Sequence, residues 1–104
     1  MSAFNTLVEK LRAIPEGDGT LLDNCAILCT SDVSKGQTHL ISEMPVIIAG
    51  SACGRLRTGY HYRSPTAENA SKLLVTLARA MDVPVAELGM GAGLVTDGLS
   101  DIEL

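Results

Sequence analysis

The sequence predicts an α/β domain with a small, mainly parallel sheet packed by two amphipathic helices. Two runs, Cys25–Thr30 and Val46–Ala49, are short and continuously apolar, which is typical of strands covered on both faces. Apolar residues recur at helical spacing both before and after these runs. The segment 31–45 between them is just long enough for the crossover of a dozen or more residues that parallel strands require. We therefore expect the two runs to be neighbouring parallel strands within α/β layers.

The first helix is predicted near the N-terminus. Its apolar positions follow one face of an amphipathic helix, and they are Phe4, Leu7, Val8, Leu11 and Ile14. Pro15 cannot continue the helix, and the Glu16–Gly19 segment is typical of a turn.

The second half of the chain predicts a ribbon, a helix and an irregular tail. Arg55–Arg63 alternates around Gly59 and indicates a ribbon or hairpin. Ser64 is the expected N-cap of the following helix, with Pro65 at its first position and Glu68 completing the capping pattern. The apolar face of that helix comprises Ala70, Leu73, Leu74, Leu77, Ala78 and Met81. From about residue 85 the tail is rich in glycine, and residues 1–104 are expected to form one domain.

Composition limits the classes of protein that this chain can belong to. Of the 104 residues, 46% are hydrophobic and 19% are charged, a balance that excludes an intrinsically disordered chain. The net charge of −4 argues against general nucleic-acid binding, because neutralising phosphates dominates that affinity. The three cysteines are an odd number without zinc-finger spacing, so we expect buried free thiols, of which Cys53 in a Gly/Ser loop is the most exposed.

The sequence also bears on location. No stretch reaches the roughly 18–20 apolar residues that span a bilayer. Glu9, Lys10 and Arg12 interrupt the region where a signal peptide would be apolar, so the chain as it stands is expected in the cytoplasm and not in a membrane.

Asp32 and His39 are the candidate metal ligands. Asp32 follows the end of the first predicted strand, where open α/β sheets place their ligands, and His39 is near enough in sequence to fold back beside it. A carboxylate and an imidazole are two ligands of the kind that zinc or manganese binds, although a catalytic zinc site has three protein ligands. The alternative interpretation is that Asp32 caps the following turn and that His39 is a surface loop residue.

A second candidate site is a strip of positive charge. Arg55, Arg57, His61 and Arg63 lie within nine residues that contain no acidic side chain. Residues two apart share a strand face, so Arg55 pairs with Arg57 and His61 with Arg63 in a candidate anion-binding strip. The alternative is a solvated strand pair facing the acidic C-terminal segment.

One block of the sequence resembles a known family. The stretch Pro15–Asn24 (Pro-Glu-Gly-Asp-Gly-Thr-Leu-Leu-Asp-Asn) precedes a buried strand, Ser31-Asp32, a His before a Pro-led strand, and Val83-Pro84-Val85. This order is similar to the C-terminal part of uncharacterised exported bacterial proteins distantly related to the alkaline phosphatase and sulfatase superfamily. The resemblance implies an alkaline-phosphatase-like layered fold, and it implies export if this chain belongs to a longer member.

Two departures from that pattern decide the expected function. The superfamily takes its nucleophile and several metal ligands from upstream strands that this chain lacks, and Val33 and Ser34 follow Asp32 where the hydrolases have His and Gly. We therefore expect no independent catalytic function, but a structural or assembly module, or the C-terminal portion of a hydrolase-like protein. The alternatives are a metal-dependent phosphoric- or sulfuric-ester hydrolase and a small anion-binding protein.

Self-association is the expected partnership. A sheet taken out of a larger layer exposes unpaired edges and apolar faces, and a two-fold dimer buries such a patch against itself. We expect a homodimer through the sheet edge or the apolar face of Phe4–Ile14, or alternatively contact with an upstream domain that this chain lacks.

Overall fold

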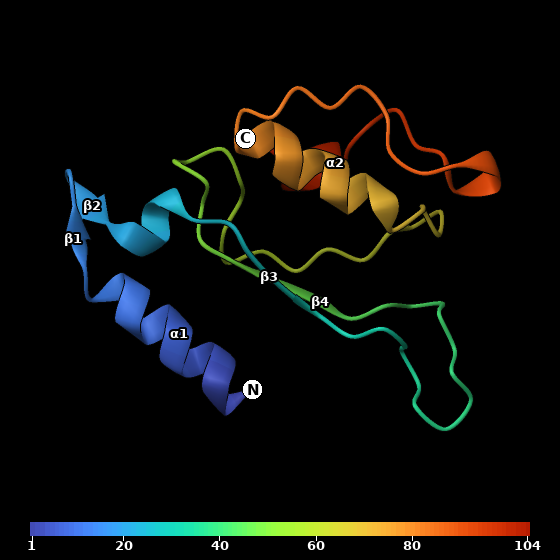
Figure 1. Cartoon of the computed structure of the whole chain (residues 1–104), viewed down its shortest axis with the longest axis horizontal. Coiled ribbons are helices and arrows are strands. Elements are labelled where there is room, and N and C mark those ends of the chain that lie inside the picture. Colours follow the sequence, from blue (N-terminus) through green and yellow to red (C-terminus); the bar gives the residue numbers. More distant parts are fainter.

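The computed structural model describes residues 1–104 and contains two α-helices and two separate two-stranded antiparallel ladders (Figure 1). The helices are α1 (Ser2–Arg12) and α2 (Ser71–Ala80), and the strands are β1 (Pro15–Glu16), β2 (Gly19–Thr20), β3 (Ile27–Thr30) and β4 (Val46–Ala49). Short 3-10 turns cover Leu21–Asn24, Gly91–Gly93 and Ser100–Ile102. The remaining residues are turns and irregular segments.

The prediction of a mainly parallel, alkaline-phosphatase-like layered sheet is wrong. Strand β4 has the predicted bounds, and β3 begins at Ile27, two residues after the predicted start. The two strands pair antiparallel, with Ile27 opposite Ala49 and Thr30 opposite Val46. The connecting segment 31–45 contains no helix that would carry the chain back to the start of a parallel strand. It folds back on itself through a bridge between Lys35 and Leu40, so β4 returns in the opposite direction.

The N-terminal helix is confirmed, and it ends before Pro15 as expected. The Pro15–Asn24 block forms the β1–β2 hairpin and a 3-10 turn. The carboxylate of Asp23 caps that turn, accepting hydrogen bonds from the Thr20 N–H at 2.7 Å and the Thr20 hydroxyl at 3.0 Å. Although α1 is amphipathic, none of its residues is buried.

Helix α2 begins later than the capping pattern predicted. The Ser64 hydroxyl does accept a hydrogen bond from the Glu68 N–H at 2.9 Å, but Ala67 has φ +53°, which interrupts any helix at that point. The contacts therefore close a turn, and the helix starts at Ser71, whose N–H donates to the Asn69 side chain at 2.9 Å.

The ribbon expected over Arg55–Arg63 does not form. Leu56 makes an isolated antiparallel bridge to Glu103, and the rest of the segment has no regular partner strand. The alternation around Gly59 is therefore a feature of an extended, irregular segment.

The core is small and lies in the second half of the chain. Seven residues are buried, and the first of them in sequence is Ala52. They are Ala52, Leu56, Leu73, Val75, Thr76, Ala80 and Val95. A folded monomer of 10.9 kDa exposes about 5,600 Å² on average, whereas this chain exposes 7208 Å². The radius of gyration of 14.8 Å likewise exceeds the roughly 13 Å typical of this length.

A tight loop after β4 builds this core. The Ala52 N–H donates to the Cys25 carbonyl and the Cys53 N–H to the Asp23 carbonyl, both at 2.9 Å. Gly50 has φ +93°, and a Cβ at this position would lie 2.7 Å from the Leu22 carbonyl oxygen and closer still to that of Cys25. Only glycine therefore allows the loop to approach the preceding turn this closely.

We expect Gly50→Ala to destabilise the protein by about 3 kcal/mol or more, since left-handed strain of about 1–2 kcal/mol adds to a backbone clash. Gly54→Ala is the matched control, because Gly54 has φ +80° but open space around its missing Cβ. Urea unfolding measures both. Equal losses in the two variants would show that strain alone, and not the close approach, makes Gly50 necessary.

Candidate functional site

The two candidate metal ligands lie on the exposed loop that joins β3 to β4. Asp32 and His39 are both exposed; the Asp32 carboxylate accepts a long 3.4 Å hydrogen bond from Ser31, and His39 has a left-handed backbone with φ +51°. No group of three or more His, Cys, Asp or Glu side chains is arranged to hold a metal ion. The residues present therefore do not provide the three-ligand set of a catalytic zinc site, and metal binding by this pair stays a prediction.

The arginines of the predicted anion strip have separate protein partners. Arg55 donates to the Ala80 carbonyl at 2.9 Å and pairs with Asp82 at 2.8 Å. The pKa of Arg55 is raised by the hydrogen bond and the charge of Asp82. Arg57 donates instead to the Glu103 carbonyl at 3.2 Å. Both side chains thus fasten the irregular segment to neighbouring main chain.

The other half of the strip lies elsewhere. Arg63 pairs with both carboxylate oxygens of Glu43, at 2.9 and 2.7 Å, which brings it against the loop that carries Asp32 and His39. His61 is exposed. The structure thus gives the three arginines three different partners, and anion binding by the strip stays a prediction.

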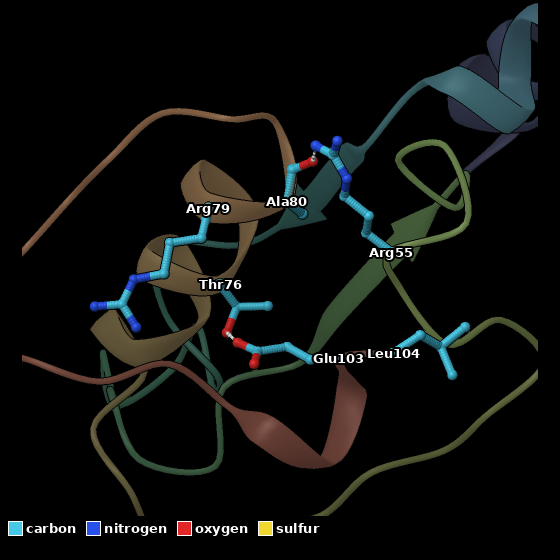
Figure 2. A pocket seen from close by; sticks show the side chains of 6 residues that line it. All are labelled: Arg55, Thr76, Arg79, Ala80, Glu103 and Leu104. Carbon is cyan, nitrogen blue, oxygen red and sulfur yellow. Dashed lines mark hydrogen bonds between the residues drawn. The ribbon is translucent and has the colours of Figure 1, made fainter.

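One shallow pocket lies beside α2 (Figure 2). It has a volume of about 180 Å³ and is lined by Arg55, Thr76, Arg79, Ala80, Glu103 and Leu104. Its polar groups bond within the protein, since Arg79 donates to the Val85 carbonyl at 3.2 Å and to the Thr96 carbonyl at 3.1 Å. This volume is below the roughly 300 Å³ at which ligand pockets begin, so the pocket is too small for a typical small-molecule site.

Another pocket is an apolar gap between the β3–β4 ladder and α2. Its volume is about 200 Å³. The lining residues are Leu28, Thr30, Ser31, Met44, Val46, Ala70, Ser71, Leu73 and Leu74. It contains no charged side chain and therefore reflects incomplete packing rather than a reaction site.

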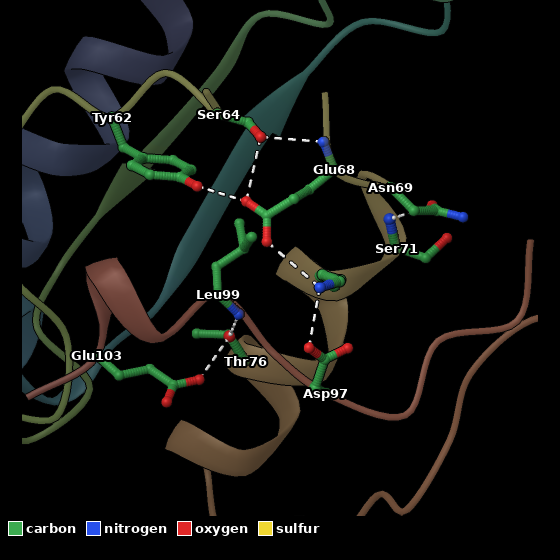
Figure 3. Close-up of polar contacts among 10 residues, drawn as sticks. Tyr62, Ser64, Glu68, Asn69, Ser71, Thr76, Asp97, Leu99 and Glu103 are labelled. Atoms are coloured by element: carbon green, nitrogen blue, oxygen red, sulfur yellow. Dashed lines mark hydrogen bonds and ion pairs between the residues drawn. The ribbon is translucent and has the colours of Figure 1, made fainter. Parts of the chain in front are cut away.

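The most connected polar cluster surrounds Glu68 (Figure 3). Its carboxylate accepts hydrogen bonds from the hydroxyls of Tyr62 and Ser64 and from the Lys72 ammonium. The hydrogen bond from Tyr62, followed by that from Lys72, lowers the pKa of Glu68. Since three donors hold this carboxylate in its ionised form, it is a poor general base.

Lys72 extends the cluster to the C-terminal tail. Its ammonium lies 2.9 Å from the Asp97 carboxylate. This contact raises the pKa of Lys72 and lowers that of Asp97. The hydrogen bond to Glu68 likewise raises the pKa of Tyr62.

Thr76 makes a second link between α2 and the tail. It is buried, its hydroxyl donates to the Glu103 carboxylate at 2.7 Å, and it accepts from the Leu99 N–H at 2.7 Å. Together the contacts of Glu68, Lys72 and Thr76 form what we call the tail clamp. Sequence reasoning assigned Glu68 only a capping role and overlooked Thr76, although a hydroxyl between Val75 and Leu77 on a buried helix was a visible signal.

The three cysteines are free, as the sequence indicated, but they are less buried than expected, with Cys53 exposed and the other two half-buried. None of the helices has both the length and the apolar character that crossing a bilayer demands. Comparison with protein-family models, curated proteins and solved structures finds no match to this chain.

The tail clamp gives stability a defined pH dependence. The pKa values of Glu68 and Asp97 lie below their ordinary 4.5 and 3.8, so their contribution is present above those values and is lost as pH falls through the lowered pKa values. The pKa values of Lys72 and Tyr62 lie above 10.5 and 10.0, so their contribution is lost as pH rises through the raised values. We expect the melting temperature to be level between about pH 5 and 10 and to fall on either side.

Glu68→Gln tests this assignment, because it keeps the shape and removes the charge. Its melting temperature should be lower than that of the wild type at pH 7 and should fall less steeply below pH 5. Glu87→Gln, on an exposed side chain, is the matched control. An acid limb that is equally steep in the wild type and in Glu68→Gln would assign the pH dependence to other groups.

Proposed function

We propose that this chain is a non-catalytic assembly module whose incomplete core is completed by another polypeptide surface. One observation carries the proposal: all seven buried residues lie between Ala52 and Val95, and none lies in residues 1–51. That first half nevertheless contains an amphipathic helix and both strands of the larger ladder. It is thus folded locally, and its apolar side chains are at most half-buried.

The exposed area supports the same proposal. The excess over an average monomer of this mass is about 1,600 Å². Large hydrophobic side chains contribute to it, including Leu7, Ile14, Ile41 and Ile47. Exposed apolar surface of this kind is typical of a protein interface. In a longer chain of the kind that the sequence resembles, upstream residues would supply the covering surface.

The polar groups favour an assembly role over catalysis. No buried side-chain nitrogen or oxygen lacks a hydrogen-bond partner. The groups whose pKa values shift do so through pairing within the protein, as in Arg55 with Asp82 and Lys72 with Asp97. Covalent catalysis by serine needs a hydroxyl bonded to an adjacent base such as histidine. The serine hydroxyls that donate hydrogen bonds here do so to carbonyl or carboxylate oxygens instead.

We expect no turnover of chromogenic phosphate or sulfate esters by the purified chain, with or without added zinc or manganese. The physical reason is that Asp32 and His39 are two exposed side chains without a third ligand or an activated nucleophile. Ester turnover above the buffer rate that Asp32→Ala and His39→Ala both abolish would contradict the non-catalytic assignment.

The incomplete core has its own test. At high dilution the chain should bind an apolar-surface dye such as ANS, and dye binding should fall when a covering surface is added, because the dye reports accessible apolar area. A chain that binds no dye and unfolds in one sharp transition at every concentration has a closed core, and the assembly proposal would then be wrong.

A further inference from the structure

The β3–β4 ladder has an inner and an outer face. Leu28 and Val46 line the gap against Leu73 and Leu74 of α2, which identifies their side of the ladder as the inner face. Successive side chains alternate between faces, and directly opposite residues share one. The outer face therefore carries Ile27, Cys29, Ile47 and Ala49.

The outer face is covered incompletely. Ile47 on this face is 44% exposed, and Ile27, Cys29 and Ala49 are half-buried. In Figure 1, α1 lies on the side of the ladder away from α2. The apolar stripe of α1 is also partly open, since Leu7 is 45% exposed, and Ile14, just after the helix, is 47% exposed. We refer to the stripe and the outer face together as the apolar outer surface, which comprises Phe4, Leu7, Val8, Leu11, Ile14, Ile27, Cys29, Ile47 and Ala49.

The exposed area of the whole chain is enough for a dimer interface. Obligate homodimers bury about 2,000–5,000 Å² in total, with a composition close to that of a protein core. The excess of about 1,600 Å² is spread over the whole chain, and burying about 1,000 Å² of it on each of two copies reaches the lower end of that range. The exposed side chains of Leu7, Ile14 and Ile47 give the apolar outer surface the composition that such an interface needs.

Charge does not oppose this pairing. The chain has a net charge of −4, so two copies repel one another wherever their acidic segments meet. The apolar outer surface contains no acidic or basic side chain, and the only charged residues of α1 are Glu9, Lys10 and Arg12. The acids of the tail, Asp97 and Glu103, bond within the chain to Lys72 and Thr76.

We infer that two copies bury their apolar outer surfaces against each other around a two-fold axis, so that the same patch serves on both sides. This inference rests on the proposed assembly function and adds the partner and the surface. In the dimer, the second copy covers the apolar stripe of α1 and the outer face of the ladder, which a single chain leaves partly exposed.

Light scattering at micromolar concentration tests the inference on the whole chain. The wild type should have twice the mass of the 10.9 kDa chain, and its melting temperature should rise with protein concentration by mass action. Leu7→Lys and Ile47→Lys place a charge on the apolar outer surface at exposed positions, so each should weaken dimerisation about tenfold or more. Asn5→Lys, on the polar side of α1, adds the same charge and should leave the dimer intact.

The outcomes separate the inference from the proposed function. A monomer that binds ANS keeps the assembly function and overturns the second copy as the partner. A monomer with a closed core overturns both. A dimer that survives Leu7→Lys and Ile47→Lys overturns the apolar outer surface as the interface. Where a variant fails to fold, the concentration dependence of wild-type melting still decides whether the chain dimerises.

Discussion

The close approach of Gly50 to the main chain around Leu22 and Cys25 is the contact on which the rest of the fold depends. It allows the loop to place Ala52 and Leu56 in the core, where they pack with Ala80. The cost is local strain, because Ala52 and Cys53 also have positive φ, at 48° and 59°. Left-handed backbone at such residues persists only where surrounding contacts fix it, and here the Cys25 and Asp23 carbonyls accept the two N–H groups.

The tail clamp adds a polar connection to this apolar one. Lys72 and Thr76 contact two separate parts of the tail from one helix, at Asp97 and Glu103. In the second half of the chain, α2 and the tail are therefore held together by buried apolar contacts and by hydrogen bonds. The two kinds of contact together fix this arrangement although few residues are buried. Helix α1 lacks both: none of its residues is buried, and its order depends on its own helical hydrogen bonds and on the short turn that follows it.

Local features of the sequence were predictable, and pairings between distant segments were not. The apolar spacing of α1 and the positions of β3 and β4 follow from patterns within a few residues. Strand direction depends on the path of segment 31–45, and an apolar run has the same pattern in a parallel or an antiparallel pair. The Ser64–Glu68 capping pattern predicted a hydrogen bond that does form. Because Ala67 has a left-handed backbone, this hydrogen bond closes a turn and not the first turn of a helix. The partners of the arginines, such as Asp82 for Arg55, lie too far along the chain for composition to indicate.

The balance between paired polar groups and exposed apolar groups supports the assembly role proposed for this chain. Catalytic sites hold polar groups in perturbed environments where substrate completes their interactions. Here the buried polar side chains are already paired, and Glu68 is stabilised as an anion by donors of the protein itself. What remains incomplete is apolar: the stripe of α1, the outer side of the β3–β4 ladder and the gap beneath α2. Because removing such surface from water is favourable, contact with another apolar surface is the interaction that would stabilise this chain most.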